Sequence, residues 1–403
     1  MRRRLAAALA AVALLASACS GSDEPSTTGT TTGGGEADDV QTITIGIDAR
    51  TDGFASSWSN FFPQKVQAHP GDTIEFRSTF TGEPHSVATG SLIAEALVAS
   101  SRIDPNSDAP PPPEIQAVLD KVPFVFSEDP DAGPDTFFVQ AASQPCYLPE
   151  NDPPTDVACP EPDQEPPEEI DGTERFLSSG FLPDGETVTF RLSDDMAPGQ
   201  YAFMCLVHGP AMTESVTVVD KATAIPGPDE VAAAGKQELD DLVAKVKTKV
   251  DGVQGITGTA ARAGATATDE VPSSASLNVM PKEITVKAGE KVTWTVDGFH
   301  TIAFNAPEDA RPWLQFDSAG ALAINKKSYA PAASPEIPAP LPGSGDPPKL
   351  PVDAGTWDGQ GYHSSGAPFT GGQVVYSLAI STPGTYKYLC LVHPDMEGTL
   401  KVT

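Results

Sequence analysis

An internal repeat constrains the fold of this 403-residue chain more than any other feature. The stretch "SSGFLPDGETVTFRLSDDMAPGQYAFMCLVH", from Ser178, matches "SSGAPFTGGQVVYSLAISTPGTYKYLCLVH", from Ser364. Upstream, "AHPGDTIEFRS", from Ala68, matches "VKAGEKVTWTV", from Val286, and a histidine follows each. Because the chain also exceeds the usual size of one domain, the repeat predicts two copies of one domain.

Both copies consist of short stretches in which apolar and polar residues alternate, separated by Gly and Pro turns. This alternation is the period of half-buried strands, and neither repeat shows a helical period. Such a pattern is typical of antiparallel β-sandwiches and Greek-key barrels. We therefore expect an all-β chain with domains over residues 40–220 and 276–403.

Three segments fall outside the repeat. Insertions are expected at about 90–174, with short helices at "SLIAEALVAS" and "PEIQAVLDKV", and at about 306–361, which is rich in Pro and Gly. Residues 221–275 are expected to form a linker that contains a helix over 229–252, followed by the loop-like "ITGTAARAGATATDEVPSS". One face of this helix would carry apolar residues, namely Leu239, Leu242, Val243, Val246 and Val250.

The first 19 residues, "MRRRLAAALAAVALLASAC", have the composition of a secretory signal. The stretch "LASAC" resembles a bacterial lipobox, which implies lipidation of Cys19, although Ala16 stands where Leu is usual. Residues 20–39 are rich in Ser, Thr and Gly and suit a disordered tether. We expect an exported protein that is lipid-anchored on the outer face of the bacterial cytoplasmic membrane, with free secretion as the alternative.

The formal net charge of −30 makes nucleic acid an unsuitable partner, because phosphate binding needs clustered Lys and Arg. The charge favours solubility, or a cationic partner. Two of the five cysteines, Cys146 and Cys159, lie in one Pro-rich stretch. An oxidising compartment favours a disulfide between them.

The end of the second copy carries Cys390, His393 and Met396 on one short loop, with His300 upstream. Two imidazoles and a thiolate with a weak axial Met form the donor set of mononuclear copper electron-transfer sites. Structural zinc fits less well, because it favours more thiolates and does not use Met. Met396 could instead pack as an apolar side chain.

These strands and loops resemble those of the cupredoxins, the plastocyanin and amicyanin family of blue copper proteins. The resemblance implies two type 1 copper ions, one in each domain. In the second domain the ligands would be the four residues just named, with the loop spacing of amicyanin. In the first they would be His85, Cys205, His208 and Met212, with one more residue between His and Met. The large insertions depart from the usual short family member.

The resemblance favours an electron carrier rather than an enzyme, with a redox partner protein that is cationic or membrane-bound. The alternatives are copper storage or delivery, and a copper-dependent oxidoreductase. Multicopper oxidases and copper nitrite reductases need further His-rich clusters, but the chain has six histidines, of which the two sites would use four. We expect His69 to be structural and His363 to be exposed to solvent.

Overall fold

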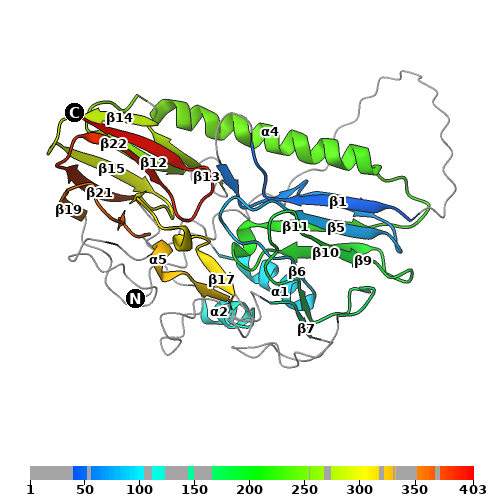
Figure 1. The fold of residues 1–403 in the computed structure, drawn as a ribbon. Helices are drawn as coiled ribbons and strands as arrows, with labels where there is room; N and C mark the ends of the chain where they lie inside the picture. Colours follow the sequence, from blue (N-terminus) through cyan, green and yellow to red (C-terminus); the bar gives the residue numbers. More distant parts are fainter. Residues whose placement is uncertain are drawn as a thin grey trace, which may run out of the picture.

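The computed structural model describes residues 40–51, 56–103, 111–122, 144–148, 166–253, 255–266, 274–316, 322–329, 332, 352–367 and 373–403. Strands dominate these residues and pair into two separate sandwiches (Figure 1), so the predicted all-β fold class is confirmed. Cys19 and Cys159 lie outside the described residues. Among the described residues, no helix is long and apolar enough to cross a membrane.

The first sandwich consists of a sheet in the order β3-β1-β5-β9 and a sheet in the order β4-β11-β10-β6-β8-β7. In β1 the buried residues alternate with less buried ones, as predicted for a half-buried strand. The strands are β1 (Thr42–Ile47), β3 (Phe61–Phe62), β4 (Lys65–Ala68), β5 (Thr73–Ser78), β6 (Ala88–Thr89), β7 (Cys146–Leu148), β8 (Phe176–Ser178), β9 (Thr187–Arg191), β10 (Gly199–Met204) and β11 (Thr213–Val218).

The second sandwich repeats this plan with sheets in the orders β19-β21-β15-β12-β13-β2 and β14-β23-β22-β16-β20. A separate hairpin, β17-β18, belongs to its insertion. The strands are β12 (Ala260–Thr266), β13 (Ser274–Met280), β14 (Glu283–Val286), β15 (Lys291–Asp297), β16 (Ala303–Phe304), β17 (Leu314–Phe316), β18 (Leu322–Ile324), β19 (Val352–Trp357), β20 (His363–Ser364), β21 (Gln373–Ile380), β22 (Gly384–Leu389) and β23 (Glu397–Val402).

Two strands of the second sandwich come from outside residues 276–403. Strand β2 (Ser56–Trp58) belongs to the first repeat but pairs with β13, with Trp58 opposite Ser274. Strand β12 lies in the range that the sequence analysis treated as linker, and it pairs with β13 and β15. Its sequence, "AARAGAT", lacks the alternation of large apolar residues that marks a strand, so the pattern did not reveal it.

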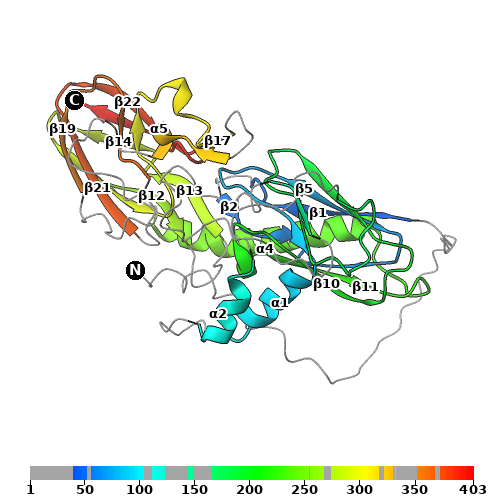
Figure 2. The same ribbon diagram turned by 90° about the horizontal axis from the view of Figure 1, so that it is seen from below.

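Helix α4 (Pro228–Val253) covers the predicted helical range and runs alongside both sandwiches (Figures 1 and 2). It contacts β1 and β3 of the first and β13 of the second. Its predicted apolar face packs on Trp58, Phe62 and Met280, in one cluster that joins the two sandwiches. The first insertion forms α1 (Ser91–Ser100) and α2 (Pro113–Leu119), as predicted, and the second forms α5 (Lys326–Tyr329).

Aromatic side chains fill both interiors. In the first sandwich the Phe76 ring lies 5.4 Å from that of Phe61 and 5.1 Å from that of Phe203. In the second, Trp294 is fully buried, and its ring lies 5.6 Å from that of Tyr388. Each fully buried aromatic side chain stabilises the fold by roughly 1.5–3 kcal/mol. These cores hold rigid the strands from which the candidate ligands extend.

Candidate metal centres

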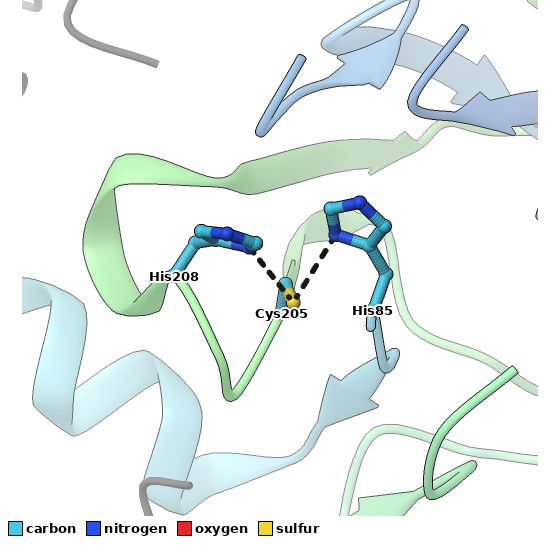
Figure 3. Close-up of side chains that lie close together, drawn as sticks. All are labelled: His85, Cys205 and His208. Carbon is cyan, nitrogen blue, oxygen red and sulfur yellow. Dashed lines mark hydrogen bonds between the residues drawn. The ribbon is translucent and has the colours of Figure 1, made fainter. Parts of the chain in front are cut away.

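The first cluster, site 1, consists of His85, Cys205 and His208 (Figure 3). Cys205 follows the end of β10, His208 lies on the turn before β11, and His85 lies on the segment leading into β6. The Cys205 Sγ atom is 3.9 Å from His85 Nδ1 and 3.6 Å from His208 Nδ1. Both imidazoles therefore turn the same nitrogen toward the sulfur.

Backbone contacts fix the sulfur at site 1. The Ser86 amide lies 3.5 Å from Cys205 Sγ and points at it, and the Leu206 amide donates to Ser86 Oγ at 3.0 Å. The Cys205 amide donates to the Met212 carbonyl at 3.1 Å, which closes the ligand loop. Because β10 and β11 pair on either side, the loop has little freedom to change shape.

The second cluster, site 2, consists of His300, Cys390 and His393 and has the same construction. Cys390 follows β22, and its Sγ atom is 3.6 Å from His393 Nδ1. The Nδ1 atoms of His300 and His393 are 3.0 Å apart. The Thr301 amide points at Cys390 Sγ from 3.5 Å, as the Ser86 amide does at site 1.

The two ligand loops differ by the one residue seen in the sequence. In site 2 the turn places Asp395 at a positive φ of 63°. In site 1 the 3₁₀ turn η2 (Gly209–Ala211) begins with Gly209 at a φ of 57°, a conformation that glycine adopts without strain. Each loop then returns to the same register: in site 2 the Cys390 amide donates a hydrogen bond to the Met396 carbonyl at 2.8 Å, as the Cys205 amide does to the Met212 carbonyl in site 1.

The predicted axial residues are placed beside their sites by these backbone bonds. Met212 is fully buried and Met396 is 1% exposed. Their role as ligands stays a prediction.

Two carboxylates stand behind the imidazoles of site 1. His85 Nε2 lies 3.3 Å from Asp48 Oδ2, which also accepts a hydrogen bond from the Thr81 hydroxyl at 2.5 Å. His208 Nε2 lies 3.0 Å from Glu83 Oε2. Such outer carboxylates orient a ligating imidazole and raise its basicity.

The acid–base balance of site 1 favours an ionised sulfur. Burial lowers the pKa of both imidazoles, but contacts with Cys205 and the carboxylates outweigh it, so the pKa is raised to about 9 for His85 and about 10 for His208. Burial likewise raises the pKa of Cys205, but hydrogen bonds from His208 and His85 hold it well below its usual value. A thiolate is the form of cysteine that binds metal.

Among the described residues, the first histidine of site 2 lacks the charged partner that His85 has in site 1. Within the part of the chain that the structure describes, His300 Nε2 has no hydrogen-bond partner; it lies against Gly264, and burial lowers the pKa of His300. His393 differs, because burial is outweighed by Cys390 and Glu83, which raise its pKa to about 9. The pKa of Cys390 is well below its usual value, since hydrogen bonds from His300 and His393 outweigh burial. The Arg311 guanidinium donates to the Cys390 carbonyl and so braces the loop.

The donor chemistry of both clusters fits copper. In each, one nitrogen from each of two imidazoles and one sulfur atom lie within 4.8 Å of one another. The side chain of His208 is 17% exposed, and the other five residues are at most 1% exposed. Imidazole and thiolate with a Met nearby form a set that suits both oxidation states of copper. The other two histidines have partners of their own, since His69 Nε2 lies 2.8 Å from the Thr223 carbonyl and His363 Nε2 lies 2.7 Å from the Tyr376 hydroxyl.

The structure also tests the predictions made for His363 and for the cysteines. The expectation that His363 is exposed is wrong, because it is 1% exposed and stacks on Trp357 as part of β20. Cys146 is disulfide-bonded, while its predicted partner, Cys159, lies outside the described residues. Cys205 and Cys390 are free thiols.

The sequence analysis missed Asp48 and Glu83. A signal existed for Glu83, because it lies two residues before the candidate ligand His85 in Gly82-Glu83-Pro84-His85, whereas the second copy reads Asp297-Gly298-Phe299-His300. Asp48 gave a weaker signal, since it follows a strand and is one acid among many.

No family model and no curated protein matches the chain. Among solved structures it is similar to auracyanin A, a "blue" copper protein from Chloroflexus aurantiacus, at 18% identity over 44% of this chain and 98% of that one, with a TM-score of 0.22. It is similar to plastocyanin from Dryopteris crassirhizoma at 20% identity over 36% and 99%, with a TM-score of 0.17.

A third similar structure is the copper-containing nitrite reductase from Thermus scotoductus, at 11% identity over 90% of this chain and 68% of that one, with a TM-score of 0.20. The fold itself is established by the described strands, which pair into two β-sandwiches as the sequence analysis predicts.

Proposed function

We propose that this chain is a copper-binding electron-transfer protein with two mononuclear type 1 centres, one in each sandwich. The observation that carries the proposal is the duplicated convergence of two imidazoles on one buried cysteine sulfur. Chance proximity of a Cys and a His does not account for two clusters with the same strand positions and the same backbone donors.

Copper held there would supply a one-electron couple between Cu(I) and Cu(II). The residues of the chain contribute rigidity: the amides of Ser86 and Thr301 aim at the sulfur atoms, and the paired strands fix the loops. Met212 and Met396 would stand as weak axial donors. A site that keeps one geometry in both oxidation states needs little rearrangement when an electron arrives or leaves.

The distribution of histidines supports a carrier over a catalyst. Four of the six histidines lie in the two sites, and the other two are engaged by Thr223 and Tyr376. Storage or delivery of copper would favour an accessible site that releases its ion. Here seven of the eight proposed ligands are almost fully buried, and the exception, His208, is 17% exposed.

We further propose export and lipid anchoring through Cys19, with a redox partner that is cationic or membrane-bound. The signal-like first 19 residues and the net charge of −30 support this placement. Mass spectrometry of the protein from a bacterial host tests it, because lipidation adds a diacylglyceryl mass to a chain that begins at Cys19.

Copper analysis of the purified protein with its visible spectrum tests the proposed function. We expect two copper ions per chain, an intense thiolate-to-copper absorption band, and reversible bleaching on reduction and reoxidation. Copper that is bound without this band would instead favour storage or delivery.

A further inference from the structure

The carboxylate of Glu83 lies between the two sites. Its Oε2 atom is 3.0 Å from His208 Nε2 in site 1, and its Oε1 atom is 3.9 Å from His393 Nε2 in site 2. The first contact is a hydrogen bond and the second is a charge contact. His393 Nε2 is buried and has no hydrogen-bond partner among the described residues, and the carboxylate of Glu83 is its charge contact.

The packing of the two sandwiches holds this arrangement in place. The Trp313 indole donates from Nε1 to the Gly82 carbonyl at 2.7 Å and stacks edge-on against Phe299, next to His300. Gly82 approaches His393 so closely that a Cβ atom there would lie 2.4 Å from His393 Cδ2. Strand β2 crosses into the second sandwich, and α4 packs on both. Several independent contacts therefore bring Glu83 to His393.

The imidazoles of His208 and His393 are oriented so that each lies between Glu83 and the sulfur of its own site. In each, Nδ1 lies 3.6 Å from the sulfur of its own site, while Nε2 turns toward Glu83. One imidazole, one carboxylate and a second imidazole thus join site 1 to site 2. Neither His85 nor His300 takes part, since His85 faces Asp48 and His300 faces Gly264.

Exposure distinguishes the two sites. The His208 side chain is 17% exposed, whereas His85, His300 and His393 are each 1% exposed. Site 1 therefore has one imidazole that is partly exposed to solvent, whereas both imidazoles of site 2 are buried.

Given the proposed function, we infer that Glu83 is a positioning residue shared by both sites and the link through which they exchange electrons. One electron lost at one site is gained at the other. During this exchange no covalent bond forms or breaks in Glu83, His208 or His393, and none of the three groups loses a proton.

The first test uses the metal-free protein and ¹⁵N-labelled histidine, with Glu83→Gln compared with wild type. We expect the Nε2 signals of both His208 and His393 to shift, while that of His85, which faces Asp48, stays unchanged. A shift of His208 alone would overturn the shared role. Glu95→Gln, which breaks an ion pair with Arg175, is the control and should move none of the three.

The second test uses the copper-loaded protein. Pulsed EPR of wild type with both ions as Cu(II) should show dipolar coupling between them, and its absence would contradict the proximity of the sites. After rapid reduction of one site, we expect the electron to redistribute at least about tenfold more slowly in Glu83→Gln than in wild type or Glu95→Gln. Unchanged redistribution would overturn the link. Failure to bind two copper ions in wild type would instead refute the proposed function, and the metal-free test would still report on Glu83.

Discussion

Gly82 of the first sandwich lies directly against His393 of the second: a Cβ atom at Gly82 would be 2.4 Å from His393 Cδ2 and 2.8 Å from His393 Cα. A residue of one repeat therefore limits the geometry of the other repeat's metal site. The two sites form a single structural unit, although their ligands come from separate halves of the sequence.

Gly82→Ala is predicted to damage site 2. The new methyl group must displace His393 or its backbone, and Gly82 also has a φ of 125°, which alanine adopts only with strain. In the Cys205→Ser background, which leaves only site 2, we expect copper affinity to fall at least about tenfold. Gly185→Ala is the matched control, because its φ is 78° but no atom lies within 4 Å of the added carbon. Equal effects of both substitutions would contradict the contact.

Asp48→Asn is predicted to weaken site 1 selectively. Asn tolerates the positive φ of 58° at this position but removes the charge that supports His85. We expect the pKa of His85 to fall from about 9 and copper affinity at site 1 to drop by about 10- to 100-fold. Site 2 provides the internal control, since no carboxylate among the described residues is hydrogen-bonded to His300 Nε2. Competition with a copper chelator, in Cys390→Ser and Cys205→Ser backgrounds, measures both.

The pH dependence of metal binding should differ between the sites. A proton at Nδ1 competes with the metal, so a raised pKa makes affinity increase with pH until that pKa is passed. Site 1 has two such groups, with pKa values of about 9 and about 10, whereas site 2 has His393 at about 9 and His300 with a lowered pKa. Near neutral pH, Zn(II) binding should release about two protons at site 1 and about one at site 2.

Calorimetry in buffers of different ionisation enthalpy counts these protons in the single-site variants. The thiolates release none, because the pKa values of Cys205 and Cys390 are already well below their usual value. The same proton count at both sites would contradict the asymmetry between His85 and His300.

Met212→Leu and Met396→Leu test the axial prediction. The thiolate and two imidazoles remain, so we expect the visible absorption to persist. Loss of a weak sulfur donor should raise the reduction potential of the altered site, because the axial ligand tunes it. Unchanged potentials would mean that both methionines only pack. Cyclic voltammetry of the single-site variants separates the two outcomes.

The sequence alone was sufficient to predict the clusters, because Cys205 with His208 and Cys390 with His393 lie three residues apart in matching strand patterns. The upstream histidines could also be assigned, since each follows the same Gly-turn strand. A single Cys and His three residues apart can arise by chance, but the same spacing in both copies, each with an upstream histidine, specifically indicates a metal site.

The relationships between the sandwiches could not be predicted in this way. Gly82 and Glu83 contact His393, and Trp313 donates to the Gly82 carbonyl, across the boundary between the two sandwiches that β2 and α4 hold together. No local period in the sequence encodes such contacts. Strand β12 could not be predicted because its buried side chains are those of alanines, which give no strong strand pattern, and because Gly264 lies so close to His300 that a Cβ atom would be 2.4 Å from its Nε2. His363 resembled a surface residue, but its imidazole is hydrogen-bonded to Tyr376 inside the fold.

Copper content and visible absorption of wild type, Cys205→Ser and Cys390→Ser measure the central claim most directly. We predict two copper ions in wild type and one in each variant, with the thiolate-to-copper band of the altered site lost and that of the other retained. Retention of both coloured centres in either variant would contradict the assignment of one copper ion to each cysteine.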